Sequence, residues 1–406
     1  MTNFIEELEA LLLERAFDKG IKERHQLGKL TEKELMPVAK ALSKLSRSFT
    51  GREEFQSGYL KDDSFRQAYL LYYLPSNILK STSLMKELNR HPSRLLEKQQ
   101  LTVLDLGSGP GTATLGLVMF LLKFPVTKKI KFVAVDMSEK SLQDCKWLVE
   151  KLSSYSNIEV EVEVIKLDLE KQIDRLSRLI YGKEFDLIVA ANLINELFKQ
   201  SRDPITERRK WLSMHILPLL EKDGSLFLIE PALKSTTQAL MDLRDKLLSE
   251  DKMSIYSPCP SSLPCPMLKT SEKDWCHSVT DWKRPSIVAQ LDRIVGNRKE
   301  MLKFSYLILR RDGKNLSDII AKKHISSWRL VSEKHNEKGK SLIYGCNGED
   351  YYPIVRLKRE ISPQNLSFND LERGQLAVFE AEKKKLSKTE IKIEAETVVE
   401  IYGPFL

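Results

Sequence analysis

The chain has 406 residues, of which 42% are hydrophobic and 30% are charged. This composition is typical of a globular protein and excludes the disordered and fibrous classes. The length predicts two or three domains. The sequence lacks an uninterrupted apolar run long enough to span a bilayer, so we expect no membrane association. The N-terminal segment MTNFIEELEALLLER is acidic and lacks the pattern of a signal or transit peptide, so a cytoplasmic protein is the default expectation.

The formal net charge of +8 is concentrated in one part of the chain. The segment from Lys283 to Glu360 holds 18 basic and 9 acidic residues, while the rest is about neutral. A local basic excess is typical of proteins that bind polyanions, although an ordinary solvated surface explains it equally well. If the first interpretation holds, Arg310 and Arg311 are expected to contact RNA phosphates.

Residues 1–98 predict an N-terminal helical region. Thr31 and Glu34 form a capping-box pattern, which predicts the start of a helix. A second helix is expected over Asp63–Leu74 and is expected to stop at Pro75, because proline lacks the backbone N–H that a helix interior needs.

Residues 99–312 alternate between strand and helix patterns, which predicts an α/β domain with a doubly wound parallel sheet. The expected strands are Thr102–Leu106, Lys131–Asp136, Glu161–Leu167, Phe185–Ala190, Ser225–Glu230, Met253–Tyr256 and Lys303–Arg310. The expected helices are Ala113–Lys123, Glu139–Leu152, Thr206–Leu220 and Thr237–Leu248.

A proline-rich and cysteine-rich loop, residues 257–285, interrupts this domain, and a loop of this length is commonly functional. The remaining residues, 313–406, predict a small C-terminal β-rich domain. Its expected strands are Trp328–Ser332, Ser341–Gly345, Tyr352–Leu357 and Val398–Tyr402.

A glycine-rich turn follows the first expected strand, in the sequence VLDLGSGPGT that begins at Val103. Gly107, Gly109 and Gly111 permit positive φ and a close approach of the backbone to a ligand. The spacing does not fit the dinucleotide fingerprint G-x-G-x-x-G or the P-loop. The pattern that remains is D-x-G-x-G-x-G, with Asp105 inside the strand.

This pattern resembles motif I of the class I S-adenosylmethionine-dependent methyltransferases. In that resemblance Asp136, at the end of the second strand, accepts hydrogen bonds from the two ribose hydroxyls of the cofactor, as an ionised carboxylate can. Asp168, after the third strand, lies where those enzymes contact adenine.

The fourth expected strand is followed by Asn192, Asn195 and Glu196, which we expect at the mouth of the cofactor pocket. They are candidate catalytic residues that orient a substrate, although capping of the next helix explains them equally well. The amino-methyltransferase motif N-P-P-Y is absent, and no cysteine nucleophile is evident at this place.

Four of the five cysteines are candidate metal ligands. Cys259 and Cys265 each lie between two prolines, Cys276 follows in the same loop, and Cys346 comes later in YGCNG. Four thiolates suit tetrahedral zinc or a cubane iron–sulfur cluster, whereas buried and inert cysteines are the alternative. The spacing matches neither a zinc ribbon nor a bacterial ferredoxin. Cys145, on an expected helix, fits the inert interpretation better.

Together, motif I, the PCP…PCP…DWCH loop, the segments KFSYLILRR and AYLLYYLPSN, and the late cysteine resemble the methyltransferase-like proteins of the mitochondrial small ribosomal subunit and their bacterial homologues. The resemblance covers residues 50 to 360, approximately. It implies a class I methyltransferase fold, S-adenosylmethionine as cofactor, and contact with the rRNA and proteins of the small subunit. It also implies a [4Fe–4S] cluster on the four cysteines, with zinc as the alternative. Ser261 departs from the histidine that the family often has there.

Two functions follow from the resemblance. The first is rRNA methylation, subunit assembly or both; the second is a non-catalytic RNA-binding assembly factor whose zinc or cluster is structural. A small-molecule methyltransferase is a third hypothesis, which the basic segment disfavours. The resemblance implies the cytoplasm in a bacterium and the mitochondrial matrix in a eukaryote.

Overall fold

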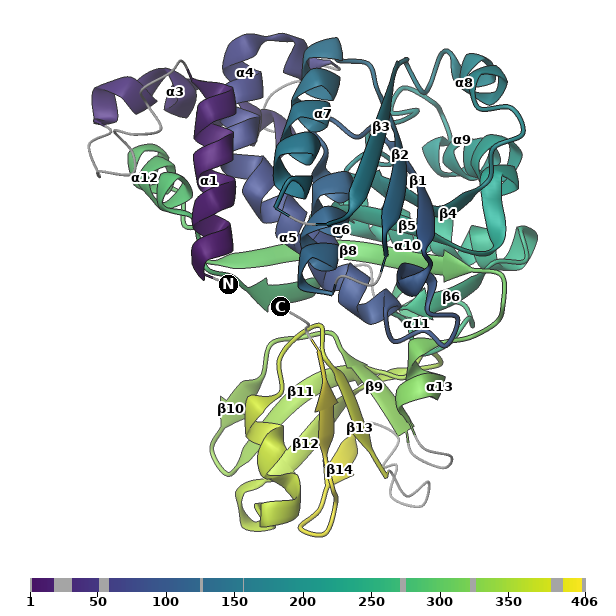
Figure 1. The fold of residues 1–406 in the computed structure, drawn as a ribbon. Coiled ribbons are helices and arrows are strands. Elements are labelled where there is room, and N and C mark those ends of the chain that lie inside the picture. The colour runs from purple at the N-terminus through teal and green to yellow at the C-terminus, as the bar shows by residue number, and fades with distance from the viewer. Residues whose placement is uncertain are drawn as a thin grey trace. The chain divides into compact units, whose positions relative to one another are not determined.

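The computed structural model describes residues 2–17, 31–50, 58–124, 127–155, 157–270, 275–321, 326–380 and 390–403. The chain divides into two compact units, each built from segments that are separate in the sequence (Figure 1). The first unit contains Met1–Met85, Leu96–Leu197 and Asp281–Leu302. The second unit contains Lys86–Leu95, Phe198–Thr280 and Lys303–Leu406.

Four parallel strands form the sheet of the first unit, in the order β3-β2-β1-β4. Their bounds are β1 Gln100–Leu106, β2 Lys129–Asp136, β3 Glu159–Lys166 and β4 Phe185–Ala191. The chain runs outward from β1 to β3 and then returns to place β4 on the other side of β1. This reversal of strand order is the point at which doubly wound sheets bind ligands, at the carboxyl ends of the strands.

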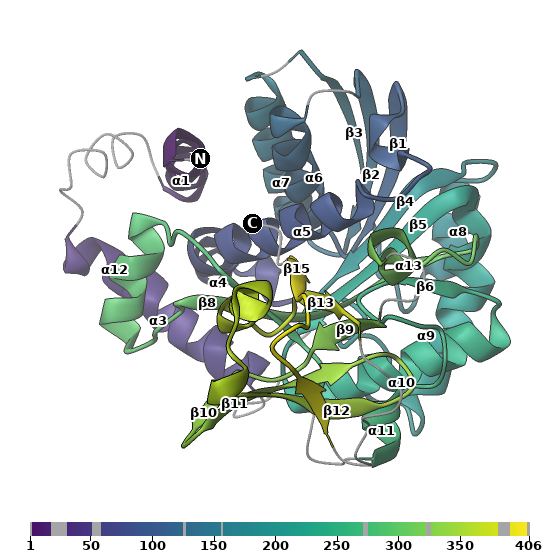
Figure 2. The same ribbon diagram turned by 90° about the horizontal axis from the view of Figure 1, so that it is seen from below.

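Helices lie on both faces of this sheet. Helices α6 (Thr112–Lys123) and α7 (Glu139–Ser153) lie on one side, and α8 (Ile173–Leu179) lies on the other (Figure 2). Every residue of α6 from Thr112 to Leu121 is buried, which explains why its sequence is apolar on all sides. The expected doubly wound α/β fold is therefore confirmed.

The N-terminal region of the first unit is helical, as expected. Its helices, with one that comes from a later segment of the chain, are α1 Thr2–Ala16, α3 Glu32–Phe49, α4 Asp63–Ala68, α5 Leu74–Leu88 and α12 Ser286–Val295. The capping box of Thr31 and Glu34 at the start of α3 is confirmed. None of the helices in the described ranges is long and apolar enough to cross a membrane.

The expected helix stop at Pro75 is wrong. A π-helical turn over Tyr69–Tyr73 continues directly from α4 into α5, and Pro75 is the second residue of α5. Proline is tolerated in the first turn of a helix, because the N–H that it lacks needs no partner there. The π turn before Pro75 also changes the pattern of backbone hydrogen bonds that proline would otherwise interrupt.

In the second unit, β8 pairs with three other strands. Antiparallel partners β5 and β6 lie on its two sides, and β7 also pairs with it. The strand bounds are β5 Leu220–Pro231, β6 Ser254–Ser257, β7 Ser278–Asp281 and β8 Met301–Arg310. The helices of this part are α9 Pro204–Trp211, α10 Lys234–Glu250, α11 Pro266–Thr270 and α13 Leu316–Ile320.

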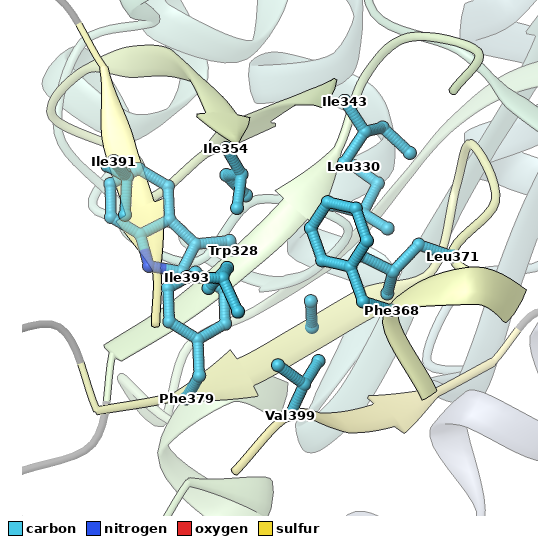
Figure 3. Packing of buried hydrophobic residues seen from close by; sticks show 11 residues of the cluster. Trp328, Leu330, Ile343, Ile354, Phe368, Leu371, Phe379, Ile391, Ile393 and Val399 are labelled. Carbon is cyan, nitrogen blue, oxygen red and sulfur yellow. The ribbon is translucent and has the colours of Figure 1, made fainter. Parts of the chain in front are cut away.

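The C-terminal part of the second unit is a separate seven-stranded sheet, which confirms the expected β-rich region. Its strands are β9 Ser326–Leu330, β10 His335–Glu337, β11 Lys340–Cys346, β12 Tyr351–Leu357, β13 Leu376–Phe379, β14 Ile391–Ile393 and β15 Glu400–Tyr402. Figure 3 shows the apolar side chains that fill its core, among them Trp328, Ile354 and Phe368. The rings of Trp328 and Phe379 stack with centroids 6.2 Å apart. This core gives the sheet its own hydrophobic stabilisation.

Candidate functional site

The glycine turn after β1 has all three glycines at positive φ: +63° at Gly107, +51° at Gly109 and +93° at Gly111. A Cβ at Gly107 would lie 2.9 Å from Leu193 Cδ1, and a Cβ at Gly111 would lie 2.7 Å from Cys145 Sγ. At Gly109 the nearest atom outside the turn would be 3.6 Å away. Close packing therefore requires glycine at positions 107 and 111. Gly109 lines a pocket, and the space where its Cβ atom would lie is open.

Asp136, the last residue of β2, is hydrogen-bonded to this turn. Its Oδ2 accepts from the Gly109 backbone N–H at 2.9 Å, and its Oδ1 accepts from the Ser138 N–H at 2.8 Å. Burial raises the pKa of Asp136, and these backbone hydrogen bonds oppose the rise. Each carboxylate oxygen has a second lone pair, so the side chain can also accept hydrogen bonds from a ligand.

A pocket of the first unit lies at the carboxyl ends of these strands. The residues predicted from the sequence that line it are Gly107, Gly109, Asp136, Asp168, Asn192 and Glu196. Three other predicted residues, Asp105, Gly111 and Asn195, are not among its lining residues.

Asp105 lies beneath the glycine turn and is only 1% exposed. Its Oδ2 accepts from the Thr114 N–H at 3.1 Å and from the Thr114 hydroxyl at 2.7 Å, which fixes the first turn of α6. Its Oδ1 is buried without a hydrogen-bond partner among the described residues. Burial is the main cause that raises the pKa of Asp105 to about 7.

The carboxylate of Asp168 and the backbone of Asn192 are held in defined conformations at the pocket. The Oδ1 atom of Asp168 accepts from the N–H groups of Glu170 and Lys171, each at 3.1 Å, which fixes its carboxylate. Asn192, directly after β4, has φ +58°, in the left-handed region that asparagine tolerates better than most residues. Both residues are among those that line the pocket.

Tyr59 and Tyr69 also line the pocket, although neither was predicted from the sequence as a pocket residue. Their ring centroids are 6.4 Å apart, and Tyr69 begins the π-helical turn. Burial raises the pKa of both hydroxyls, and the nearby charge of Glu196 raises them further. The aromatic run YLLYYLP is a local signal for Tyr69 but does not include Tyr59. The π-helical turn, a feature that often lies at functional sites, is visible only in the structure.

The four candidate ligand cysteines line one pocket of the second unit. Cys259 follows β6, Cys265 precedes α11, Cys276 precedes β7, and Cys346 ends β11. Burial raises the pKa of Cys265 to about 11 and of Cys346 to about 12, and the charge of Cys259 adds to both shifts. Cys145 lies in the first unit, buried and apart from this group.

The donor set of this pocket fits a thiophilic cation or cluster, since four cysteines line it together with Met241, Met267 and Val331. Within the described ranges, however, no group of three or more His, Cys, Asp or Glu residues is arranged to hold a metal ion. Zinc and iron–sulfur binding are therefore not shown by the structure.

The expectation that Arg310 contacts RNA is wrong. The Arg310 side chain is buried, donating to Asp312 Oδ2 at 2.8 Å and to Ser225 Oγ at 2.6 Å. Its neighbour Arg311 donates to the backbone carbonyls of Leu217 and Leu220. Part of the basic excess therefore stabilises the second unit.

One protein-family model, described as mitochondrial small ribosomal subunit Rsm22, matches residues 65–359. The chain belongs to the Rsm22 family. None of the curated proteins compared with the chain matches it. The match spans the glycine turn, the pocket residues predicted from the sequence and all four candidate ligand cysteines, so the resemblance predicted from the sequence is confirmed.

Solved structures similar to this Rsm22-family chain include methyltransferases. An O-methyltransferase from Bacillus cereus in complex with SAH is 12% identical, with a TM-score of 0.33 over 57% of this chain and 80% of that chain. TrmN from Thermus thermophilus is 16% identical, with a TM-score of 0.31 over 59% of this chain and 53% of that chain. Because these TM-scores are low, the fold assignment depends on the strand order of the sheet.

Proposed function

We propose that this Rsm22-family chain binds S-adenosylmethionine in the pocket of the first unit and acts on the rRNA of the small ribosomal subunit, by methylation, by assisting assembly, or by both. The observation that carries the proposal is the hydrogen bond from the Gly109 N–H to Asp136 at the point of strand-order reversal, next to the open space at the Gly109 Cα atom. When bound, the cofactor supplies an activated methyl group.

Different residues of the chain bind different parts of the cofactor. Asp136 accepts hydrogen bonds from the ribose hydroxyls, and Asp168 contacts the adenine. Gly107 and Gly109 allow the backbone to approach the cofactor closely. Asp105 acts from below by fixing the first turn of α6, while Gly111 packs against Cys145.

The methyl-acceptor side of the pocket consists of Asn192 and Glu196, with Asn195 as the third candidate catalytic residue. Tyr59 and Tyr69 offer aromatic faces on which a base can stack, and Glu196 offers an acceptor for an exocyclic amine. These residue types suit a nucleobase better than an apolar small molecule.

For the cysteine pocket we propose a [4Fe–4S] cluster on Cys259, Cys265, Cys276 and Cys346, with zinc as the alternative. The support is that four thiols, three from the loop 257–285 and one from the end of β11, line one pocket. Small-subunit rRNA and proteins are the proposed partners. The proposed location is the mitochondrial matrix in a eukaryote and the cytoplasm in a bacterium.

A non-catalytic assembly factor is the second candidate function. It is favoured by the absence of the N-P-P-Y motif and by the position of Asn195 outside the pocket lining. In that case the cofactor pocket would serve binding and not methyl transfer.

Calorimetry with S-adenosylmethionine tests the proposal. Gly109→Val should abolish binding, because the new side chain would enter the space beside Asp136. Gly182→Val is the matched control, since Gly182 also has positive φ (+74°) but a Cβ added there would have nothing within 4 Å. The control should bind like the wild type, and equal binding by all three proteins would overturn the site.

The same proteins distinguish the two functions. Purified small subunits are incubated with labelled S-adenosylmethionine, and RNA crosslinks are mapped in parallel. Methyl transfer to rRNA by the wild type and by Gly182→Val, but not by Gly109→Val, supports the enzyme. Crosslinks to rRNA without any methyl transfer support the assembly factor.

A further inference from the structure

A buried arginine faces the cysteine pocket. Arg244, on α10, is only 2% exposed, and its Nε donates to Cys259 Sγ at 3.2 Å. Its Nη1 donates to the Leu263 carbonyl at 2.8 Å and to Asp245, and its Nη2 donates to the Ser261 carbonyl at 2.7 Å. One guanidinium therefore holds a thiol and two backbone carbonyls of the same short loop.

The neighbouring residue on α10 holds the other end of that loop. Both carboxylate oxygens of Asp245 are within hydrogen-bond distance of the Cys265 backbone N–H, at 2.9 and 3.1 Å. The loop from Cys259 to Cys265, which carries two of the four thiols, is thus fixed at both ends by consecutive helix residues. A rigid helix is a precise support for such ligands.

The charge of Arg244 is offset by two neighbours, Asp245 and Cys259. Its carboxylate partner among the described residues, Asp245, also accepts a hydrogen bond from the Cys265 N–H and has a side chain that is 25% exposed. Burying a cation is costly unless it is paired with negative charge. The group that Arg244 faces on its other side is the Cys259 sulfur, which becomes negative when it ligates a metal.

A second buried arginine nearby differs in this respect. Arg329, on β9, lies 3.6 Å from Glu87 and donates to the carbonyls of Pro258 and Gly374. Its described hydrogen bonds reach no thiol. Arg329 also lines the pocket, and its charge acts on Cys276. The direct hydrogen bond to a sulfur atom is what distinguishes Arg244 from Arg329.

We propose that Arg244 is the positioning residue of the cysteine pocket: it fixes the Cys259–Cys265 loop and supplies the positive charge that stabilises ligating sulfur. This inference rests on the proposed metal or cluster site. Hydrogen bonds and charges near the sulfurs set the reduction potential of iron–sulfur clusters. A cation beside Cys259 stabilises the reduced cluster, which carries one more negative charge than the oxidised cluster. Arg244 therefore raises the midpoint potential of the cluster.

Two variants separate the two roles. Arg244→Lys keeps a positive charge but loses the fork that reaches two carbonyls, whereas Arg244→Met loses both. Arg356→Lys is the matched control, because Arg356 is also a buried arginine of the second unit, donates to Asn365 and Asn369, and does not line the pocket.

The first readout uses the full chain without metal. Amide hydrogen exchange in residues 259–265 should be faster in both Arg244 variants and unchanged in Arg356→Lys. Unchanged exchange in both Arg244 variants would overturn the positioning role.

The second readout uses the chain reconstituted anaerobically with ferrous iron and sulfide. Relative to the wild type, the midpoint potential should become more negative in Arg244→Met, should move less in Arg244→Lys, and should not move in Arg356→Lys. A loaded Arg244→Met protein with the wild-type potential would overturn the charge role and leave the cluster proposal intact. A wild-type chain that retains neither iron nor zinc would overturn the metal site and the charge role together, while the exchange experiment would still decide the positioning role.

Discussion

At the scale of single residues, burial decides which predicted side chains are available to a ligand. Asp105 and Asp136 both end in carboxylates and lie near the glycine turn. Asp105 accepts a hydrogen bond from the first turn of α6, whereas Asp136 lines the pocket. Arg310 looked like an RNA contact, but its guanidinium is bound to Asp312 inside the second unit. Residue type alone did not separate these cases, because partners distant in the sequence determine exposure.

His91 gives a pH dependence that belongs to this scale. The Ser93 N–H donates to His91 Nδ1 at 3.1 Å, so that nitrogen is held as an acceptor, and Nε2 lies 3.0 Å from Asp312 Oδ2. Burial and the charges of Arg310 and Lys314 lower the pKa of His91 to about 4, although Asp312 opposes this. As the pH falls from about 6.5 to about 4, the unfolded chain binds a proton that the folded chain does not, so stability decreases in that window.

The measurement is the free energy of unfolding at several pH values in the wild type and in His91→Gln. The variant should lose less stability than the wild type between pH ~6.5 and ~4. His335→Gln, at an exposed histidine of β10, serves as the control and should follow the wild type. Parallel curves for all three proteins would contradict the prediction.

At the scale of secondary-structure elements, local sequence patterns predicted helices and strands correctly where residues close in sequence determine where the element begins or ends. The capping box at Thr31 depends on residues three positions apart, and it is present. The stop at Pro75 failed because the chain can continue through a π turn, which depends on how the helix packs. Edge strand β3, with the sequence EVEVEVIK, carries glutamates that pair with Lys129 and Lys183, as suits the exposed edge of a sheet.

The Thr31 cap makes a stability prediction for this scale. Thr31 accepts the Glu34 N–H, and the Glu34 carboxylate accepts the Thr31 N–H at 2.9 Å. Thr31→Ala should lower the free energy of unfolding by about 1 kcal/mol, because one helix N–H loses its side-chain partner. Thr31→Ser, which keeps the hydroxyl, should stay close to the wild type in the same urea titration. Equal loss in both variants would show that the hydroxyl does not act as the cap.

At the scale of the whole molecule, the chain brings segments together that are far apart in sequence. In the second unit, the loop with Cys259 and Cys265 meets the turn that follows Cys346. A Cβ at Gly348 would lie 2.3 Å from Ser261 Oγ and 2.9 Å from the Ser261 backbone nitrogen. The two segments therefore pack so closely that only glycine fits at position 348.

Gly348→Ala tests this close packing. The added methyl group should push the Cys346 turn away from the Cys259–Cys265 loop and reduce the iron retained after reconstitution. Gly339→Ala is the control, because Gly339 has a similar φ of +87° but nothing within 4 Å of a Cβ. Both variants carry backbone strain of about 1–2 kcal/mol, and Gly348→Ala should lose more stability and more iron. Equal effects in the two variants would show that the contact with Ser261 has no role in the site.

The sequence by itself determined the elements that depend on neighbouring residues: the strand–helix alternation, the glycine turn after β1, Asp136 at the end of β2, and the cysteines as a candidate set. Local hydrophobic periodicity and backbone preferences specify such features, so they can be recognised without the fold. Only the tertiary structure decided which side chains meet. It placed Tyr59 and Tyr69 in the pocket, buried Asp105 and Arg310, and brought Arg244 to Cys259. These outcomes depend on burial and on contacts between distant segments, and no short window of sequence contains both partners.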